Sequence, residues 1–276
     1  MSIQSKKNIL PGTFLLAALV ALYFPFLQTL VANWAVNDDY SHGYFIPFLT
    51  IYFIYHMRDE LKQLKIKPNI FGLLIIAAGL GQLLIAKIGS EFFLQRTSFV
   101  IVLYGLVLFF LGWDYFKKLF LPLSYLFFMI PLPAIVWNKI AFPMQLFASG
   151  LTENMVYSLG IPIFRQGNVL QLAETTLEVV AACSGLRSLM TMFALSGALA
   201  IISTIPRWKK WLLFFAAAPI AVIANITRLT GTAVLASRYG SDVAQGFLHD
   251  FSGLVVFGLG LGLLVGVNAL LTKTWK

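Results

Sequence analysis

The chain has 276 residues, of which 59% are hydrophobic and only 11% are charged. Soluble domains carry about 25% charged residues, so a water-facing surface over most of this protein is excluded. We therefore predict a single integral membrane domain over residues 1–276, with an all-α polytopic fold. The net charge of +9 does not require nucleic acid as a partner, because cytoplasmic loops of membrane proteins collect Lys and Arg.

About eight apolar segments are candidates for transmembrane helices, because a spanning helix needs roughly 20 mostly apolar residues. In chain order they are residues 10–34, 42–57, 70–88, 97–112, 119–132, 183–204, 211–236 and 251–271. The first follows Lys6 and Lys7 and lacks a small-residue cleavage site, so it is interpreted as a retained helix. The fifth is short, so the number of spans is approximate.

The positive charges predict the orientation of these helices. With the N-terminus in the cytoplasm, 13 of the 20 basic residues fall in cytoplasmic segments, together with only three acidic residues, Asp59, Glu60 and Asp114. These basic residues are Lys6, Lys7, Arg58, Lys62, Lys65, Lys67, Lys117, Lys118, Arg207, Lys209, Lys210, Lys273 and Lys276. An even number of spans returns the C-terminus to the cytoplasm. We therefore expect a multi-pass protein of the cytoplasmic (inner) membrane with both termini inside.

Residues 134–182 are then predicted to form an outer insertion, on the periplasmic or extracellular side. Its first part has Ile135, Phe142, Leu146 and Met155 among polar neighbours, which is typical of an interfacial amphipathic helix. Residues 161–172 contain two short apolar runs around residues 166–168. This pattern predicts a small β-hairpin, with an irregular loop as the alternative.

The sixth span opens with the single cysteine, Cys183, which excludes an internal disulfide and a cysteine-based metal site. Cys183 is predicted near a helix N-terminus, where the positive end of the helix dipole favours a thiolate. Arg187 lies one turn further along the same face. The alternative is that Cys183 is a small packing residue, as most cysteines in membrane helices are.

Further polar residues fall near the same outer boundary. At 1.5 Å per residue, Arg228 lies roughly 25 Å along the seventh span, and Asn225 shares its face by i,i+3 spacing. His249 precedes the eighth span, and His42 lies at the outer end of the second. The alternatives are a snorkelling arginine at a helix end and ordinary interfacial histidines.

This set of residue types indicates thiol chemistry. A Cys with a His is the nucleophile–base pairing of thiol hydrolases and transferases, and an Arg stabilises an oxyanion or holds a carboxylate. His249 and His42 are rival candidates for the base. The chain has no H-E-x-x-H motif, no pair of intramembrane aspartates and no G-x-S-x-G elbow. We expect neither a metal nor a cofactor.

The ordered set of motifs resembles the exosortase/archaeosortase family. It comprises A-C-S-G at residues 182–185, N-x-x-R at Asn225 and Arg228, and His249. The S-H-G triplet at residues 41–43 and the segment 160–168 are also similar to exosortases. The similarity covers most of the chain, from about Trp34 to the eighth helix. A histidine at position 249, where archaeal members often have a second arginine, fits the bacterial branch better.

The resemblance implies a membrane cysteine protease or transpeptidase that cleaves C-terminal sorting tails of secreted proteins at the outer face of the membrane. Such PEP-CTERM-like tails carry a short Pro-Glu-Pro-type signature, one transmembrane helix and a basic cluster. The resemblance assigns the catalytic set to Cys183 as nucleophile, Arg228 and His249. The candidates for substrate binding or support are Arg187, Asn225, Ser184, Arg165 and His42.

One position departs from the family pattern. Many members carry an acidic residue two positions before the cysteine, and Ala181 stands there in this chain. Any role for that acid therefore passes to Glu178 or Asp250.

The expected partners are the secreted tails, membrane lipids and an extracellular polysaccharide or lipid amine as acceptor. Two other functions remain open. A transporter or flippase for polysaccharide or lipid intermediates would hold anionic groups with Arg187 and Arg228, and would not need Cys183. A thiol acyltransferase would use the same thiol on a lipid substrate.

Overall fold

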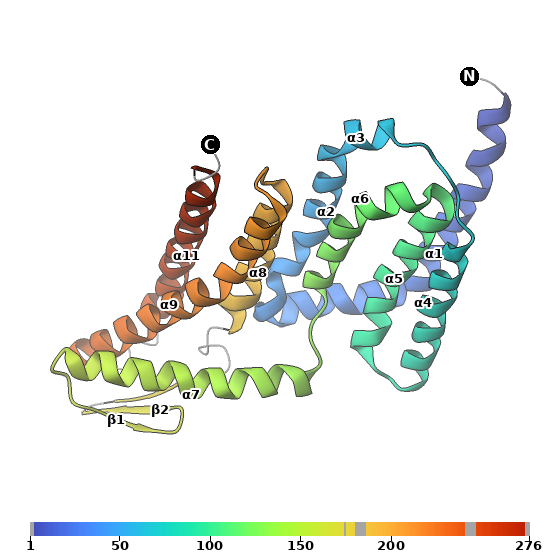
Figure 1. Ribbon diagram of the computed structural model, residues 1–276. Helices are drawn as coiled ribbons and strands as arrows, with labels where there is room; N and C mark the ends of the chain where they lie inside the picture. Colours follow the sequence, from blue (N-terminus) through green and yellow to red (C-terminus); the bar gives the residue numbers. More distant parts are fainter. Residues whose placement is uncertain (1–2, 174, 180–185, 241–246, 274–276) are drawn as a thin grey trace. The chain divides into compact units, whose positions relative to one another are not determined.

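The computed structural model describes residues 3–173, 175–179, 186–240 and 247–273. This part of the chain is mostly helical and contains one small three-stranded sheet. It divides into two compact units, Met1–Pro131 and Leu132–Lys276 (Figure 1), which we name unit 1 and unit 2.

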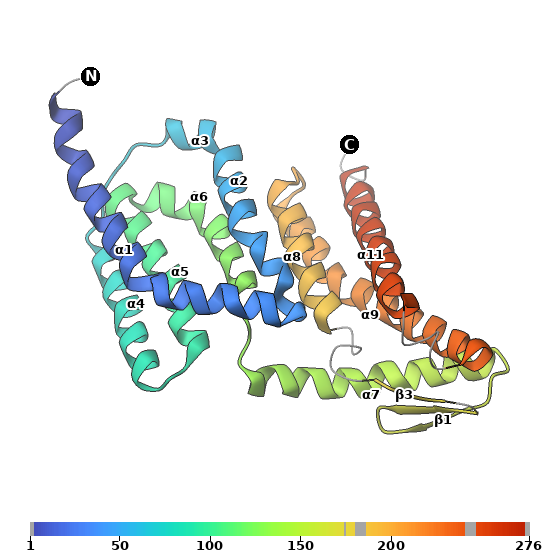
Figure 2. The ribbon, with the colours of Figure 1, turned by 180° about the vertical axis from the view of Figure 1, so that it is seen from behind.

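Unit 1 is built from helices. The longer ones are α1 (Ile3–Val36), α2 (Ile46–His56), α4 (Phe71–Ile88), α5 (Phe92–Leu111) and α6 (Trp113–Ser124). The shorter ones are α3 (Arg58–Gln63) and the 3-10 helices η1 (Asp38–Tyr44) and η2 (Tyr125–Met129). Helices α4 and α5 pair along their length, and α1 packs on them through Tyr23, Leu83 and Val102 (Figure 2).

The α4–α5 pair is closely packed because glycines face the partner helix. A Cβ on Gly72 would lie 2.4 Å from the backbone nitrogen of Phe109, and one on Gly105 would lie 2.7 Å from Ile76. Between helices in lipid, such close backbone approach replaces the hydrophobic effect as the main source of attraction. Larger residues at these positions would force the helices apart.

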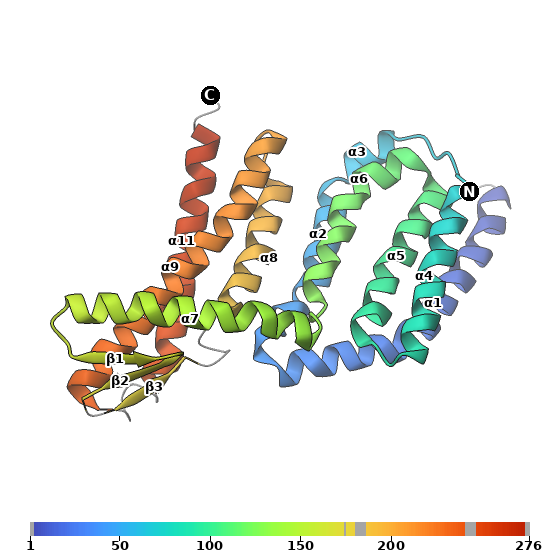
Figure 3. The same ribbon diagram turned by 60° about the horizontal axis from the view of Figure 1, so that its bottom comes forward.

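Unit 2 contains α7 (Ala134–Ser158), β1 (Ile163–Gln166), β2 (Val169–Leu172), β3 (Thr176–Glu178), α8 (Leu186–Ile202), α9 (Arg207–Tyr239) and α11 (Phe247–Lys273). Helices α8, α9 and α11 pack around Leu213, Ile220 and Leu264. Helix α7 runs across the end of α8 and α11 instead of alongside them (Figures 1 and 3). This orientation suits an interfacial helix, although its place in a membrane stays a prediction.

The sheet lies along α7 and has the strand order β1-β2-β3, with both pairs antiparallel (Figure 3). Gln166 pairs with Val169, so the turn consists of Gly167, with φ of +67°, and Asn168. Leu172 and Leu177 pack on a cluster of small residues from α7 and α9. The predicted hairpin is confirmed, and a third strand, β3, extends it.

For two of the predicted helices, the structure shows a local reason why the helix begins at a different residue from the one expected. The second starts at Ile46 instead of residue 42, because residues 38–44 form η1, whose N-cap Asn37 accepts a hydrogen bond from the Asp39 N–H at 3.0 Å. The fourth starts at Phe92 instead of residue 97, because the Glu91 carboxylate caps it by accepting from the Leu94 N–H at 3.0 Å.

The eight predicted spans all overlap helices in the described part of the chain, but their number stays a prediction. Four described helices are long and apolar enough to cross a membrane, namely α1, α4, α5 and α9. A fifth span results only if the helical segments before and after residues 130–133 count as one broken span. The protein is thus a helical membrane protein with at least these four candidate spans.

Candidate active site

The predicted catalytic residues all belong to unit 2. Cys183 and Ser184 lie within residues 180–185, outside the described residues. The structure describes only the backbone of His249, in the first turn of α11. Arg228, with Asn225, lies on α9. The candidate site is therefore defined by the residues on either side of the cysteine segment and by α9.

The cysteine segment is anchored at both ends. Before it, Val179 is only 1% exposed, and its N–H donates to the carbonyl of Asn168 at 2.9 Å. The Asn168 amide Nδ2 in turn donates to the carbonyl of Val179 at 3.2 Å. After it, Leu186 is fully buried at the start of α8. The described residues on either side of positions 180–185 are therefore fixed in the core of unit 2.

The second anchor places the start of α8 beside α9. Leu186 belongs to one buried cluster with Ala217 and Ala221 of α9. Asn225 and Arg228 follow Ala221 by about one and two helical turns. Asn225 is 2% exposed, and the Nη2 atom of Arg228 is shielded from solvent. Polar groups enclosed in a membrane protein are costly and are usually functional, so this end of α9 is the best candidate for the site.

The length of α9 is consistent with a position of Arg228 at the boundary of the hydrocarbon core of the membrane. Its 33 residues correspond to about 50 Å, whereas the hydrocarbon core is about 30 Å thick. Arg228 lies about 32 Å along the axis from Arg207. If Arg207 marks one boundary of the core, Arg228 therefore lies at the other.

Arg187 is the second residue of α8 and lies next to the buried Leu186. Its carbonyl accepts a hydrogen bond from the Thr191 hydroxyl at 3.0 Å. Both candidate cations of unit 2, Arg187 and Arg228, are half-buried and belong to the paired helices α8 and α9. This part of unit 2 is thus suited to anionic groups.

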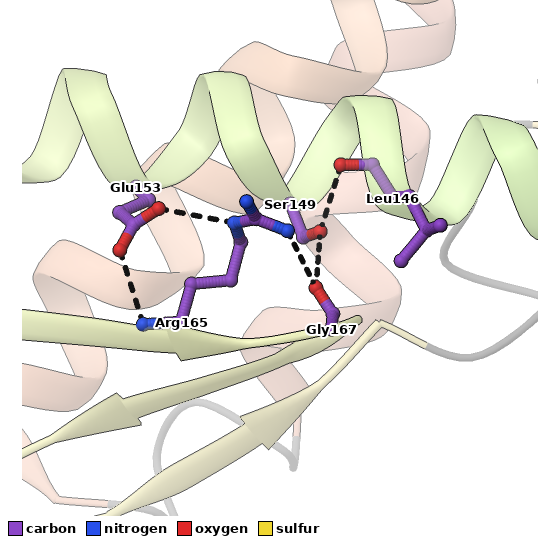
Figure 4. Close-up of polar contacts among 5 residues, drawn as sticks. All are labelled: Leu146, Ser149, Glu153, Arg165 and Gly167. Atoms are coloured by element: carbon purple, nitrogen blue, oxygen red, sulfur yellow. Dashed lines mark hydrogen bonds and ion pairs between the residues drawn. The ribbon is translucent and has the colours of Figure 1, made fainter.

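Arg165, a candidate substrate ligand, joins the sheet to α7 (Figure 4). Its Nε donates to Oε2 of Glu153 at 3.0 Å, and its backbone N–H donates to Oε1 at 3.0 Å. Its Nη1 donates to the carbonyl of Gly167 at 3.0 Å, and the Ser149 hydroxyl donates to the same carbonyl at 3.1 Å. Arg165 therefore has a structural role in the described fold.

His42 lies in unit 1, where it joins η1 to η2. Its Nε2 is 3.1 Å from the carbonyl oxygen of Phe128, and the neighbouring Trp34 Nε1 donates to the carbonyl of Met129 at 2.8 Å. A Cβ on Gly43 would lie 2.4 Å from the Trp34 ring nitrogen. The S-H-G triplet is therefore explained locally by packing at this junction.

A second enclosed arginine, Arg96, is not among the site residues predicted from the sequence. Arg96 on α5 is 6% exposed, and its Nη2 and Nη1 atoms lie 2.8 and 3.1 Å from the side-chain oxygen of Asn33 on α1, in the amide orientation that satisfies both groups. The available signal was the polar run at residues 95–98. Its first two residues, Gln95 and Arg96, precede the fourth predicted helix, which starts at residue 97.

The comparison with known families agrees with the motifs. A family described as transmembrane exosortase matches residues 34–266. The matched region extends over both units and includes the cysteine segment, α9 and the start of α11. No curated protein and no solved structure matches the chain. Because the match covers far more than half of the 276 residues, this protein belongs to the transmembrane exosortase family.

Proposed function

We propose that this protein is a membrane cysteine protease or transpeptidase that cleaves the C-terminal sorting tails of secreted proteins at the outer face of the cytoplasmic membrane. The observation that carries the proposal is the family match over residues 34–266. That region contains Cys183, Arg228 and His249 in the order in which the resembling motifs occur. Exosortase family membership supports the processing of sorting signals in general, and the specific reaction is our proposal.

The geometry of unit 2 supports a thiol site at this place. Val179 and Leu186 anchor the cysteine segment, and Leu186 packs beside the part of α9 that leads to Asn225 and Arg228. A short segment held between two buried residues is suited to presenting a nucleophile, because its ends cannot drift away from the cation.

The proposed first step is an acyl transfer. The Cys183 sulfur gives its proton to His249 and attacks the carbonyl carbon of a peptide bond in the tail. The C–N bond then breaks, the leaving amine takes the proton from His249, and the acyl group stays on sulfur as a thioester. Water, or an amine of a polysaccharide or lipid, attacks the thioester and restores the thiol.

The roles of Arg228 and His249 follow from their proton chemistry. An arginine stays charged because its pKa exceeds about 12, so it is a poor proton donor and is suited to holding the oxyanion or a substrate carboxylate. A histidine has an ordinary pKa of about 6.5 and can carry a proton near neutral pH. We therefore assign charge stabilisation to Arg228 and proton transfer to His249.

Substitution of the cysteine tests the function. We expect Cys183→Ala and Cys183→Ser to fold normally and to lose tail processing, because a small packing residue tolerates such changes at modest cost whereas a nucleophile does not. Processing is measured on a tail-bearing reporter protein, and folding by the thermal melting of the purified variants. Wild-type processing by the Ala variant would contradict the thiol mechanism and favour a transporter.

A further inference from the structure

The sheet of unit 2 has two edges, and contacts within the described residues close one of them. In an antiparallel ladder, successive residues direct their N–H and C=O groups alternately toward and away from a given neighbour. On β1, the N–H of Arg165 points away from β2 and donates to Glu153 of α7 at 3.0 Å (Figure 4). The outer edge of β1 is therefore occupied by a helix side chain.

The register of β3 shows which of its groups face β2. Leu172 donates its N–H to the carbonyl of Thr175 at 2.8 Å, and Val179 donates its N–H to the carbonyl of Asn168 at 2.9 Å. Residues 175 and 179 thus face β2, and so does residue 177, which pairs with Leu170. By the alternation of the ladder, residues 176 and 178 direct their backbone groups to the outer edge.

This outer edge of β3 is open in the described part of the chain. Thr176 and Glu178 are both exposed, and no strand among the described residues pairs with β3 on that side. An exposed strand edge presents unpaired donors and acceptors, and is a template for another extended chain.

The open edge leads directly to the proposed nucleophile. Cys183 is five positions after Glu178, so the two Cα atoms lie within about 18 Å of each other even when the chain is fully extended. The strand is also supported, because Leu177 packs on a buried cluster that includes Ala233 of α9, the helix that carries Arg228. A peptide lying along β3 would run past the beginning of the cysteine segment.

We propose that the outer edge of β3 binds the extended segment of a sorting tail as a fourth strand, and so positions the bond to be cleaved at Cys183. Strand addition is a recurring mode of peptide recognition, in which main-chain hydrogen bonds supply affinity. It suits a substrate that must be extended at the cleaved bond. The inference rests on the proposed function and specifies the surface that holds its substrate.

A backbone methylation scan of the substrate tests the strand addition. The probe is a Pro-Glu-Pro-type tail peptide with one N-methyl group placed at each non-proline residue in turn, and the receptor is the full-length Cys183→Ala protein in lipid nanodiscs. A strand bound along one edge uses alternate N–H groups, so we expect about five- to tenfold weaker binding at every second position. A flat profile, or equal losses at consecutive positions, would overturn the inference.

A proline pair tests the same edge from the protein side. Thr176→Pro removes an N–H that faces away from β2, a position where edge strands tolerate proline, and Thr176→Ala keeps that N–H as the matched control. We expect the Pro variant to process tails about five- to tenfold more slowly than the Ala variant. The rate of iodoacetamide labelling at Cys183 should stay equal in the two. Equal processing by both variants would exclude this edge as the binding surface.

The outcomes separate the inference from the function on which it rests. Normal processing by the wild type with a flat methylation profile overturns the edge alone. Failure of the wild type to process any tail overturns the function. A concentration-dependent dimer that dissociates in Thr176→Pro would assign the edge to a second copy of the chain and would also overturn the inference.

Discussion

His42 illustrates how a candidate base can serve the fold instead. Its ring is enclosed between η1 and η2, with Nε2 3.1 Å from the carbonyl oxygen of Phe128. A ring whose Nε2 is engaged with a backbone carbonyl is poorly placed for proton transfer. We therefore favour His249 as the base.

A hierarchy among three side chains is expected if the catalytic roles are right. Arg228→Lys keeps the charge but loses the planar fork, so most activity should be lost. His249→Ala should slow acylation strongly, while Cys183 remains present for slow alkylation by iodoacetamide. His42→Ala should have a smaller effect on turnover.

Turnover and the pH profile of iodoacetamide labelling, measured in each variant, distinguish these roles. The assignment of the base is wrong if loss of His249 changes neither quantity while loss of His42 abolishes turnover.

At the level of elements, α7 serves as the support of the sheet. The Glu153–Arg165 pair fixes β1 on α7. The hydrogen bonds between Asn168 and Val179 then fix the position of Val179, the last described residue before the cysteine segment. The side chains of Glu153 and Arg165 are 29% and 33% exposed, so solvent screens the pair in part. Its main contribution is to set the position of β1.

Removal of this pair should loosen the sheet. Glu153→Ala leaves the backbone N–H and the Nε of Arg165 without their acceptor, so we expect a loss of about 1–2 kcal/mol in unfolding free energy. Arg165→Lys should lose a similar part, because an ammonium group cannot reproduce the fork. Chemical denaturation of the purified variants measures both effects. Lys139→Ala, at an exposed position of α7, is the control, and an equal loss there would show that the pair is unimportant.

At the scale of the whole molecule, the orientation in the membrane decides where the reaction occurs. Helix α2 has 11 residues, or about 16 Å, which is shorter than a hydrocarbon core of about 30 Å. The second predicted span therefore depends on the residues that flank α2. The charge asymmetry still predicts both termini inside and residues 134–182 outside.

Reporter fusions test this orientation. We expect fusions after residues 65, 208 and 276 to behave as cytoplasmic and a fusion after residue 165 to behave as external. The fusion after residue 65 tests the second predicted span in particular, because it would behave as external if α2 does not cross the membrane. A cytoplasmic result at residue 165 would overturn the placement of the active site.

Much of this protein could be predicted from local properties of its sequence. The low charge content required a membrane fold, and the Gln166–Val169 pair around Gly167 formed the expected hairpin, because a two-residue turn is decided by the residues next to it. The spacing of Cys183, Asn225, Arg228 and His249 indicated the family that the comparison then confirmed. These features need no knowledge of distant contacts.

Tertiary structure alone decided the features that depend on partners far away in the sequence. Arg165 binds the carboxylate of Glu153, Arg96 lies within hydrogen-bond distance of the Asn33 side chain, and His42 contacts the backbone carbonyl of Phe128. Periodicity and motifs describe one segment at a time. They therefore cannot distinguish a side chain that is available to bind a substrate from one that is engaged in a tertiary contact. For the same reason, only the register of β3 on β2 reveals which edge of the sheet stays open.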